Sequence, residues 1–326
     1  MKSVRSSRGW TRAAVAALAG ALTLGLAACG SGSDEAGGGG EPVTITHAQG
    51  ETTITGVPER VVTLGNQWLD TAQVLGVQPV GYIDNVAVVG KGVTPWEPES
   101  LKQSKALDTT GSVVEQVAAL APDLILVDAF LADAKMYGDL SKVAPTIPAL
   151  SKDAVAAWQD QVKALGKVLH KDEAAEKVVT DLNTRIEAIG KKNPTLAGKT
   201  FVSSWLASPA QLMVLTDAKD PSATLFTQQG MTVPAGLAAK GGTGGRLSLS
   251  PERLDELNAD LVLAGYSPGM DEKWKQLPGY NELPAVKKNS LVFLTVQEIT
   301  AVNQPTPLSL PYVLDKLEPA FANAAK

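Results

Sequence analysis

Two stretches of this chain repeat one sequence pattern more than a hundred residues apart. Val113–Val127 reads VVEQVAALAPDLILV and Ser250–Ala264 reads SPERLDELNADLVLA, so both follow E-x-(V/L)-x-x-L-x-x-D-L-(I/V)-L. Each stretch predicts a short helix followed by a continuous apolar strand, and such strands are typical of buried parallel sheets. A chain that contains this unit twice is predicted to form two α/β lobes.

Other predicted strands and helices alternate around the two repeats, as they do in βαβ units. A helix is predicted for 68–77, where Trp68, Ala72 and Leu75 stand at helical spacing, and a last helix for TPLSLPYVLDKL at 306–317. The predicted strands outside the repeats are RVVTLG (60–65), PVGYI (79–83), KTFVSSW (199–205), QLMVL (211–215) and SLVFLTV (290–296).

Residues 151–195 differ because they predict helix without an intervening strand. Apolar residues recur at spacings of three and four from Val155 to Leu169, and helical spacing continues from Ala175 to Ile189. The predicted fold is therefore two Rossmann-like α/β lobes joined by a long helical backbone segment, with a ligand cleft between the lobes. The predicted boundaries are 43–150 for the N-terminal lobe, 151–195 for the helical linker and 196–326 for the C-terminal lobe.

The first 28 residues have the composition of a secretion signal. Four basic residues and no acid precede an apolar run from Ala13 to Ala28, which is shorter than the roughly 20 residues that a spanning helix needs. The run leads into LAAC, which resembles the lipobox of bacterial lipoproteins, whose cysteine carries lipid and becomes the mature N-terminus. Cys29 is the only cysteine, so no intramolecular disulfide can form. A plain secretory signal with a chance cysteine is the alternative interpretation.

Residues 29–42 are small and polar, and they predict a flexible tether between the lipid and the folded part. Without the four basic residues of the signal, 25 Lys and Arg stand against 34 Asp and Glu, a net charge of −9. An excess of negative charge argues against nucleic acid as a partner. The expected location is the cell membrane, with the protein anchored by lipid on the extracytoplasmic face.

A cleft between two α/β lobes is expected to be lined by the loops that leave the carboxyl ends of the strands. Four of the six tryptophans fall in these loops, and aromatic residues make up only 5% of the chain. This placement favours a bulky, partly apolar ligand, although local packing explains any single tryptophan equally well. The predicted cleft loops are 65–68, 85–96 and 128–137 in the first lobe, and 205–211, the Gly-rich loop to 246, 266–274 and 297–303 in the second.

The Gly-rich segment KGGTGGR at 240–246 is predicted to be a flexible cleft loop. It lacks the Lys-Ser/Thr pair of a phosphate loop, and it misses G-x-G-x-x-G because Leu247 holds the last position. Arg246 is a candidate donor to a negatively polarised oxygen of a hydroxamate or carboxylate, with a solvated loop arginine as the alternative. No G-x-S-x-G or H-E-x-x-H occurs, and neither His47 nor His170 lies in a nucleophile or metal motif, so no enzyme is predicted.

Three features in this order identify a family resemblance. VPERVVTLG at 57–65 is followed by a helix ending LGVQPVG, then by the paired repeats, and finally by TPLSLPYVLDKL. From about Val43 to the C-terminus the chain resembles the helical-backbone class of substrate-binding lipoproteins of ABC importers, which serve iron siderophores, haem and cobalamin. The resemblance implies a monomer that binds its substrate without a cofactor and delivers it to a membrane permease dimer.

The residues of the predicted cleft favour some ligands of this class over others. Haem would need a His or Tyr ligand, and with the histidines outside the cleft only tyrosines such as Tyr137, Tyr266 and Tyr280 are left. Direct metal binding would need clustered His or carboxylate groups, which the cleft loops lack. A chelate that brings its own donor atoms needs neither. A ferric siderophore, of hydroxamate type, is favoured over cobalamin and haem. A lipid-anchored envelope enzyme or adhesion protein is the alternative from another class. The predicted ligand-binding residues are Trp68, Trp96, Tyr137, Trp205, Arg246, Tyr266 and Trp274.

The repeated glutamates, Glu115 and Glu252, have two interpretations. In the resembling family an acidic residue at this place in each lobe meets arginines on the two permease subunits, which implies docking. Helix capping is the alternative, since Ser112 and Ser250 are candidate N-caps and an acid in the first turn is favoured by the helix dipole.

Overall fold

The N-terminal lobe is built on a parallel sheet. The computed structural model describes residues 41–131, 133–152 and 155–326. In this lobe the sheet strands are β3 (Val61–Leu64), β4 (Gly81–Ile83), β5 (Lys105–Ala106), β6 (Leu124–Val127) and β7 (Thr146–Ile147). Their order is β5-β4-β3-β6-β7, and every pair is parallel. The central strands β3 and β6 are buried along their whole length, as their unbroken apolar sequences predict.

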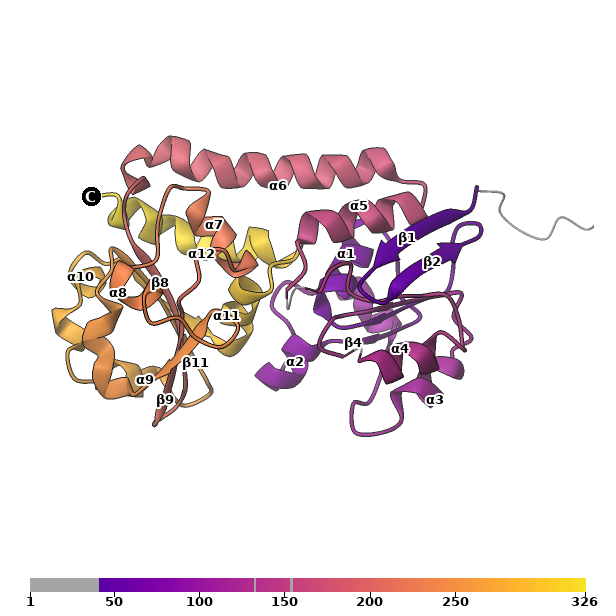
Figure 1. Cartoon of the computed structure of the whole chain (residues 1–326), viewed down its shortest axis with the longest axis horizontal. Coiled ribbons are helices and arrows are strands. Elements are labelled where there is room, and N and C mark those ends of the chain that lie inside the picture. The colour runs from indigo at the N-terminus through magenta and orange to yellow at the C-terminus, as the bar shows by residue number, and fades with distance from the viewer. Residues whose placement is uncertain (1–40, 132, 153–154) are drawn as a thin grey trace, which may run out of the picture. The chain divides into compact units, whose positions relative to one another are not determined.

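Helices and a hairpin cover this sheet (Figure 1). The antiparallel hairpin of β1 (Val43–His47) and β2 (Gly50–Ile54) packs Ile45 and Ile54 into one of the lobe's two apolar cores. The helices are α1 (Asn66–Val74), α2 (Asn85–Gly90), α3 (Val113–Ala118), α4 (Ala134–Leu140), α5 (Trp158–Val168) and the 3₁₀ helix η1 (Glu99–Gln103).

The C-terminal lobe contains a mixed five-stranded sheet. Its strands are β8 (Phe201–Ser208), β9 (Gln211–Leu215), β10 (Arg246–Leu249), β11 (Leu261–Tyr266) and β12 (Leu291–Thr295), in the order β10-β9-β8-β11-β12. The pairs of β11 are parallel, whereas those of β9 are antiparallel. The helices are α7 (Thr224–Thr227), α8 (Ala235–Ala238), α9 (Asp271–Lys275), α10 (Pro284–Lys287), α11 (Val296–Asn303) and α12 (Ser309–Ala324), with 3₁₀ helices η2 (Pro194–Leu196), η3 (Pro221–Ala223), η4 (Pro251–Leu257) and η5 (Tyr280–Glu282).

The two repeats occupy matching places in the two sheets. Strand β6 lies beside β3 in the first lobe, and β11 lies beside β8 in the second, each in parallel pairing. The helical parts differ, because α3 is an α-helix and η4 is a 3₁₀ helix interrupted at Arg253, where φ is −94° and ψ is 37°. The prediction of two like helices is corrected to this extent, because the backbone leaves helical geometry at Arg253.

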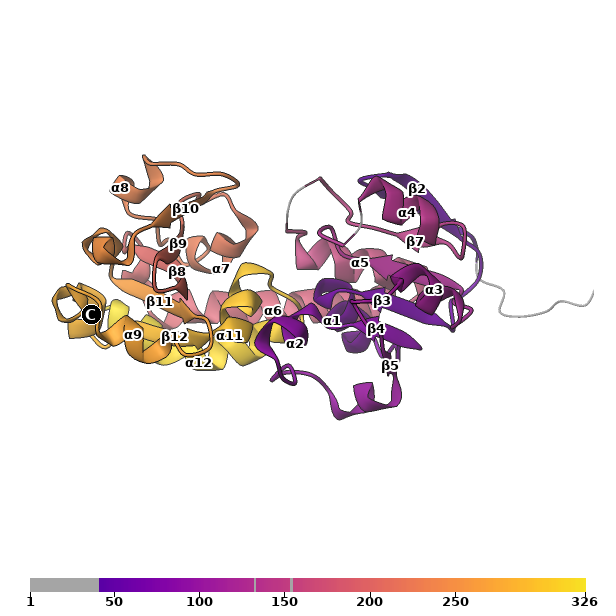
Figure 2. The same ribbon diagram turned by 90° about the horizontal axis from the view of Figure 1, so that it is seen from below.

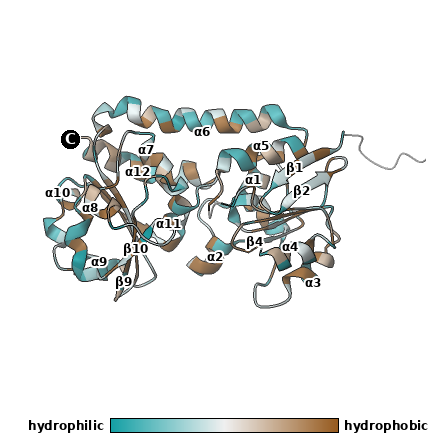
Figure 3. Cartoon of the chain, viewed as in Figure 1, coloured by the Kyte–Doolittle hydropathy of each residue, from teal (hydrophilic) through white to brown (hydrophobic). Residues whose placement is uncertain are grey.

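One helix, α6 (Asp172–Lys192), belongs to both lobes. Its N-terminal half contributes Ala175, Val179 and Leu182 to the core of the first lobe, and its C-terminal half contributes Ile186 and Ile189 to that of the second. Figure 3 shows the alternation of hydrophilic and hydrophobic bands along this helix that the spacing predicts. The helix continues two residues past Gly190, to Lys192. Within the described residues, no helix has the length and apolar character to span a bilayer.

A buried carboxyl joins the lobes beneath this helix. Asp70 on α1 is 2% exposed, and its Oδ2 accepts hydrogen bonds from the hydroxyl of Thr306, which precedes α12, and from Nε1 of Trp96. The indole of Trp96 in turn packs on Tyr312 of α12, with ring centroids 5.8 Å apart. Helices α2 and α11 also lie side by side (Figure 2), and Gln297 on α11 donates to the carbonyls of Gly92 and Val93 at 3.1 Å. The lobes are thus linked by hydrogen bonds from neutral donors, which go to the carboxyl group of Asp70 at one place and to backbone carbonyls at another.

This junction predicts a dependence of stability on pH. Burial raises the pKa of Asp70 from 3.8 to about 7, because desolvation outweighs the hydrogen bonds from Thr306 and Trp96, and the carboxyls of Asp84 and Asp128 add to the rise. Between these values the folded protein keeps a proton that the unfolded chain loses. The free energy of unfolding therefore falls as the pH rises from about 4 to about 7.

We expect Asp70→Asn to remove this fall in the free energy of unfolding, since the amide oxygen of asparagine can accept both hydrogen bonds. The variant should match the parent near pH 4 and exceed its unfolding free energy at pH 8 by up to about 4 kcal/mol, measured by urea denaturation across this range. Asp139→Asn is the control, because ion pairs with Lys135 and Lys142 lower the pKa of the Asp139 carboxyl to about 2. Replacing this carboxyl should not raise the free energy of unfolding at pH 8. A variant less stable than the parent at every pH would contradict the prediction.

Candidate functional site

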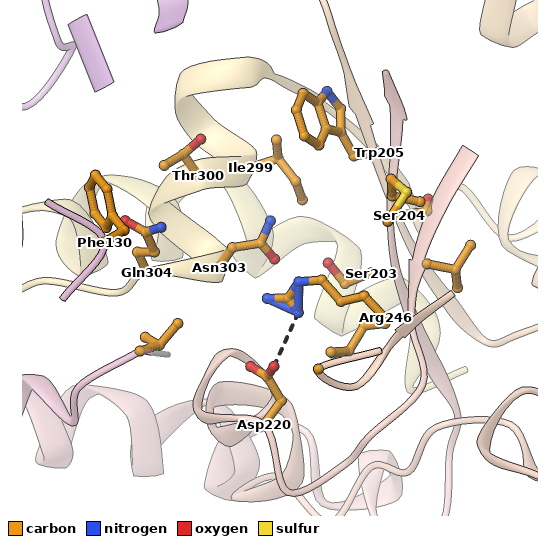
Figure 4. Close-up of a pocket in the computed structure, with 15 residues that line it drawn as sticks. Phe130, Ser203, Ser204, Trp205, Asp220, Arg246, Ile299, Thr300, Asn303 and Gln304 are labelled. Atoms are coloured by element: carbon orange, nitrogen blue, oxygen red, sulfur yellow. Dashed lines mark hydrogen bonds and ion pairs between the residues drawn. The ribbon is translucent and has the colours of Figure 1, made fainter. Parts of the chain in front are cut away.

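A pocket of about 480 Å³ opens between the C-terminal lobe and two apolar residues, Phe130 and Val155, from the N-terminal half of the chain (Figure 4). Its size lies within the range of sites for small molecules. Most of its wall comes from β8, β9 and α11, and Phe130 and Val155 close it from the segments after β6 and before α5. The other lining residues are Ser203, Ser204, Trp205, Met213, Val214, Leu215, Asp220, Gly244, Arg246, Ile299, Thr300, Asn303 and Gln304.

Arg246 is the charged centre of this pocket. It begins β10, which pairs with β9, and its Nη1 lies 3.1 Å from Oδ2 of Asp220. Its Nη2 also donates to Oγ of Ser222 at 3.5 Å. The side chains of Arg246 and Asp220 are 27% and 12% exposed, so the pair is largely shielded from water. The guanidinium keeps further N–H groups for a ligand, held in direction by the carboxylate.

Neutral groups form the rest of the wall. Trp205 on β8 stands opposite Met213 on β9, so a planar ring and a polarizable thioether lie together on one side. Figure 4 shows Asn303 and Arg246 directed toward the same space, with Thr300 and Gln304 nearby on the α11 side. Phe130 is 50% exposed at the far edge. The pocket thus offers large apolar surfaces with a few amide and hydroxyl groups.

The lining residues exclude some chemistry. Among the described residues around the pocket there is one cation, Arg246, and one anion, Asp220, so their charges cancel. None of these residues is a histidine, tyrosine or cysteine. In the described part of the chain no group of His, Cys, Asp and Glu is arranged to hold a metal ion.

Two of the seven predicted ligand-binding residues line the pocket, Trp205 and Arg246. Trp68 and Trp274 are fully buried, and the prediction that they face the cleft is corrected because each lies on the inner face of a helix, α1 or α9. The Nε1 of Trp274 donates to the carbonyl of Gly265, also within the core.

The other three predicted residues lie outside the pocket. Trp96 is at the lobe junction, bonded to Asp70 as described above. Tyr137 on α4 packs edge-on against His47 of the β1–β2 hairpin, with centroids 5.5 Å apart. Tyr266 at the end of β11 packs against Phe293. In each case the loop or strand end was assigned from the sequence, but the direction of the side chain was not.

Several pocket residues escaped the sequence analysis. Phe130, Thr300 and Asn303 fall inside the predicted cleft loops, and Phe130 could have been found as the one phenylalanine in them. No sequence pattern predicts Asp220 as a pocket residue, because its contact with Arg246 depends on the pairing of β10 with β9. The segment around Arg246 was predicted as loop, whereas Arg246–Leu249 forms β10 and only the glycines before it make a turn.

The two docking candidates lie on the surface at matching places. Glu115 and Glu252 are both exposed, and the backbone N–H of each donates to the hydroxyl of Ser112 or Ser250, at 3.4 Å in both lobes. The N-cap positions are thus as predicted, and they leave both carboxylates free to point outward. Cys29 lies outside the described residues.

Comparison with known proteins agrees with this geometry. The family model described as periplasmic binding protein matches residues 61–297. Over 259 residues the chain is 27% identical to the Fe(3+)-citrate-binding protein YfmC of Bacillus subtilis (strain 168), covering 76% of each protein.

Two solved structures are similar over most of the chain. One is a periplasmic solute binding protein from Mycobacterium smegmatis str. MC2 155, with a TM-score of 0.73, 27% identity and coverage of 87% of this chain and 99% of that one. The other is PiaA of Streptococcus pneumoniae TIGR4 in complex with ferrichrome, with a TM-score of 0.68, 25% identity and coverage of 87% and 98%.

Proposed function

We propose, from the premise that this chain belongs to the periplasmic binding protein family, that it captures a ferric siderophore and delivers it to an ABC importer permease. Proteins of this family act outside the cytoplasm, where they bind the substrates of transporters, and they are not enzymes. The observation that carries the proposal is the pocket, which combines large apolar and aromatic surfaces with a few amide and hydroxyl groups, and in which the charges of Arg246 and Asp220 cancel; its described lining residues include no histidine, tyrosine or cysteine. Such a site suits a chelate that surrounds its own metal ion.

The balance of charge favours a hydroxamate chelate. Three hydroxamate groups carry one negative charge each and neutralise Fe³⁺, whereas catecholate groups carry two each and leave a highly anionic complex. An anion of that kind needs several unpaired cations when it is taken from water. Among the described residues of the pocket the one cation is Arg246, which is already paired with Asp220. Hydroxamate oxygens can instead accept single hydrogen bonds from Arg246 and Asn303.

Binding of a panel of chelates tests this function. The lipid-free domain, residues 41–326, should bind ferrioxamine B one to one, with quenching of tryptophan fluorescence through Trp205. Ferric tris-catecholate, ferric citrate, cobalamin and haem are the competing ligands in the same assay. Binding of none of the ferric complexes would refute the proposed function, and tight binding of cobalamin or haem alone would replace it.

Arg246→Ala is expected to weaken binding of ferrioxamine B by roughly 10- to 100-fold. The loss has two causes: the hydrogen bonds to the ligand disappear, and the largely shielded carboxylate of Asp220 is left without a cation beside it. Isothermal titration calorimetry measures the change. Arg253→Ala is the matched control, because Arg253 is more exposed and pairs with Glu256 away from the pocket. Equal affinities of both variants would show that Arg246 does not contact the chelate.

We also propose that lipid on Cys29 holds the protein on the extracytoplasmic face of the membrane. Two acyl chains, at about 0.8 kcal/mol for each buried CH₂, give stable anchoring where one chain does not. Cys29→Ala should therefore appear in the soluble or culture fraction, or stay unprocessed, when fractions are probed by immunoblotting. A processed variant that stays in the membrane fraction would contradict lipid anchoring at this residue.

A further inference from the structure

A second cavity, of about 210 Å³, lies behind the ligand pocket at the junction of the lobes. Its wall is formed by the segment 156–159, by α6, by the turn and helix at 219–228 and by the ends of α11 and α12. Except for Ser222, the buried side chains that face it are apolar, and the larger ones are Trp158, Ile186, Leu225, Val302, Leu310 and Val313. Apolar cavities of roughly 150 Å³ stay dry and bind small apolar molecules such as benzene.

Apart from the buried hydroxyl of Ser222, which is bonded to Arg246, the polar groups of this cavity lie toward its rim. Thr224 and Gln228 are exposed at its edge, and Lys219 is the one charged residue among the described residues that line it. Among the residues that the structure describes, no carboxylate or histidine lines the wall. The chemistry of the cavity therefore fits a hydrocarbon chain and not a polar head group.

The two cavities share a partition. In three segments neighbouring residues line opposite cavities, as Val155 and Ala156, Asp220 and Pro221, and Gln304 and Pro305 do. The hydrogen bond from Nη2 of Arg246 to Oγ of Ser222 joins a residue of the first cavity to a residue of the second. Where the segment 155–157 forms the partition, its side chains are small, a valine followed by two alanines.

We infer that the ligand is an amphiphilic ferric chelate, whose head occupies the first pocket and whose hydrocarbon chain occupies the second cavity. The inference rests on the proposed function and adds the substrate class to it. A chelate head that contacts Arg246 lies within one side chain of the second cavity, so a short alkyl chain on the head reaches it past the partition. Burial of that chain adds affinity without any further polar contact.

Two chelates that differ only in chain length test this. The terminal amine of ferrioxamine B is acylated with an acetyl or an octanoyl group, which gives two complexes of equal charge. Each methylene taken from water into an apolar site contributes up to about fourfold. We expect the octanoyl chelate to bind the lipid-free domain at least tenfold more tightly than the acetyl chelate by calorimetry.

Variants at the rim of the second cavity test where the hydrocarbon chain of the chelate binds. Thr224→Phe fills the edge of the second cavity from an exposed position, and it should reduce the octanoyl affinity to that of the acetyl chelate while leaving acetyl binding unchanged. Thr227→Phe, one turn further along α7 and outside the cavity, is the matched control and should keep the tenfold difference.

The outcomes are distinct. Equal affinities of the two chelates would overturn the inference and leave the proposed function intact. A tenfold difference that persists in Thr224→Phe would also overturn it, because the chain would then bind elsewhere. If neither chelate binds while the protein is folded by circular dichroism, the proposed function fails and the inference falls with it.

Discussion

Replacement of Gly65 by alanine is expected to destabilise the N-terminal lobe by about 4 kcal/mol or more. Gly65 precedes α1 with φ 113° and ψ 157°, a conformation that is essentially restricted to glycine and costs other residues about 1–3 kcal/mol. A Cβ at this position would lie 2.2 Å from Oδ2 of Asp128, far inside contact distance. The added methyl group therefore displaces a buried carboxyl.

That carboxyl is the cap of the helix. Gly65 has no side chain with which to cap α1, and Asp128, directly after β6, accepts from the N–H groups of Gln67 at 3.0 Å and Trp68 at 3.2 Å. Burial raises the pKa of Asp128 to about 7, and these two hydrogen bonds oppose the rise. Loss of such a cap costs about 0.5–2 kcal/mol in addition to the backbone strain.

Thermal unfolding monitored by circular dichroism measures the effect, and the expected fall in Tm is about 8–16 °C. Gly138→Ala is the control, because Gly138 lies within α4 with nothing near the position of a Cβ, and alanine there favours the helix. A Tm of Gly65→Ala within a degree or two of the parent would show that the β3–α1 turn relaxes freely.

The second large effect is expected in iron uptake. Glu115→Lys combined with Glu252→Lys should reduce uptake of a radiolabelled ferric hydroxamate at least tenfold in cells while leaving its affinity for the purified protein unchanged. We propose that these exposed carboxylates, at matching places in the two lobes, each meet a cationic group on one half of a permease dimer. Charge reversal replaces attraction by repulsion in both contacts, and charge pairs set both encounter rate and register.

Helix capping makes a different prediction for the same variant. A lysine in the first turn opposes the helix dipole by about 0.3–1 kcal/mol at each site, which lowers stability slightly and leaves uptake normal at equal protein level. Glu173→Lys with Glu282→Lys is the matched control, because both residues are exposed acids in the first turn of a helix outside the repeats. Normal uptake by the double repeat variant, or an equal loss in the control, would contradict docking.

Most of the predicted strands and helices, and the family resemblance, follow from patterns within the sequence. QLMVL forms β9 at the predicted residues, and the strands in the two repeats form β6 and β11 as expected. The apolar stripes of the middle segment predict α5 and α6, since helical periodicity depends only on spacing along the chain. Serine before a helix likewise predicts an N-cap, because the hydrogen bond joins residues two or three apart.

Only the tertiary structure decided which side chains form the site. Trp68, Trp205 and Trp274 carry the same local signal, yet packing buries two of them in the cores and leaves Trp205 on the pocket wall. Arg246 acquires its partner Asp220 only when β10 pairs with β9. Contacts of this kind join residues that are distant in sequence, and their direction depends on how sheets and helices pack rather than on periodicity. The position of a loop at a strand end can therefore be predicted, whereas the orientation of its side chains requires the assembled fold.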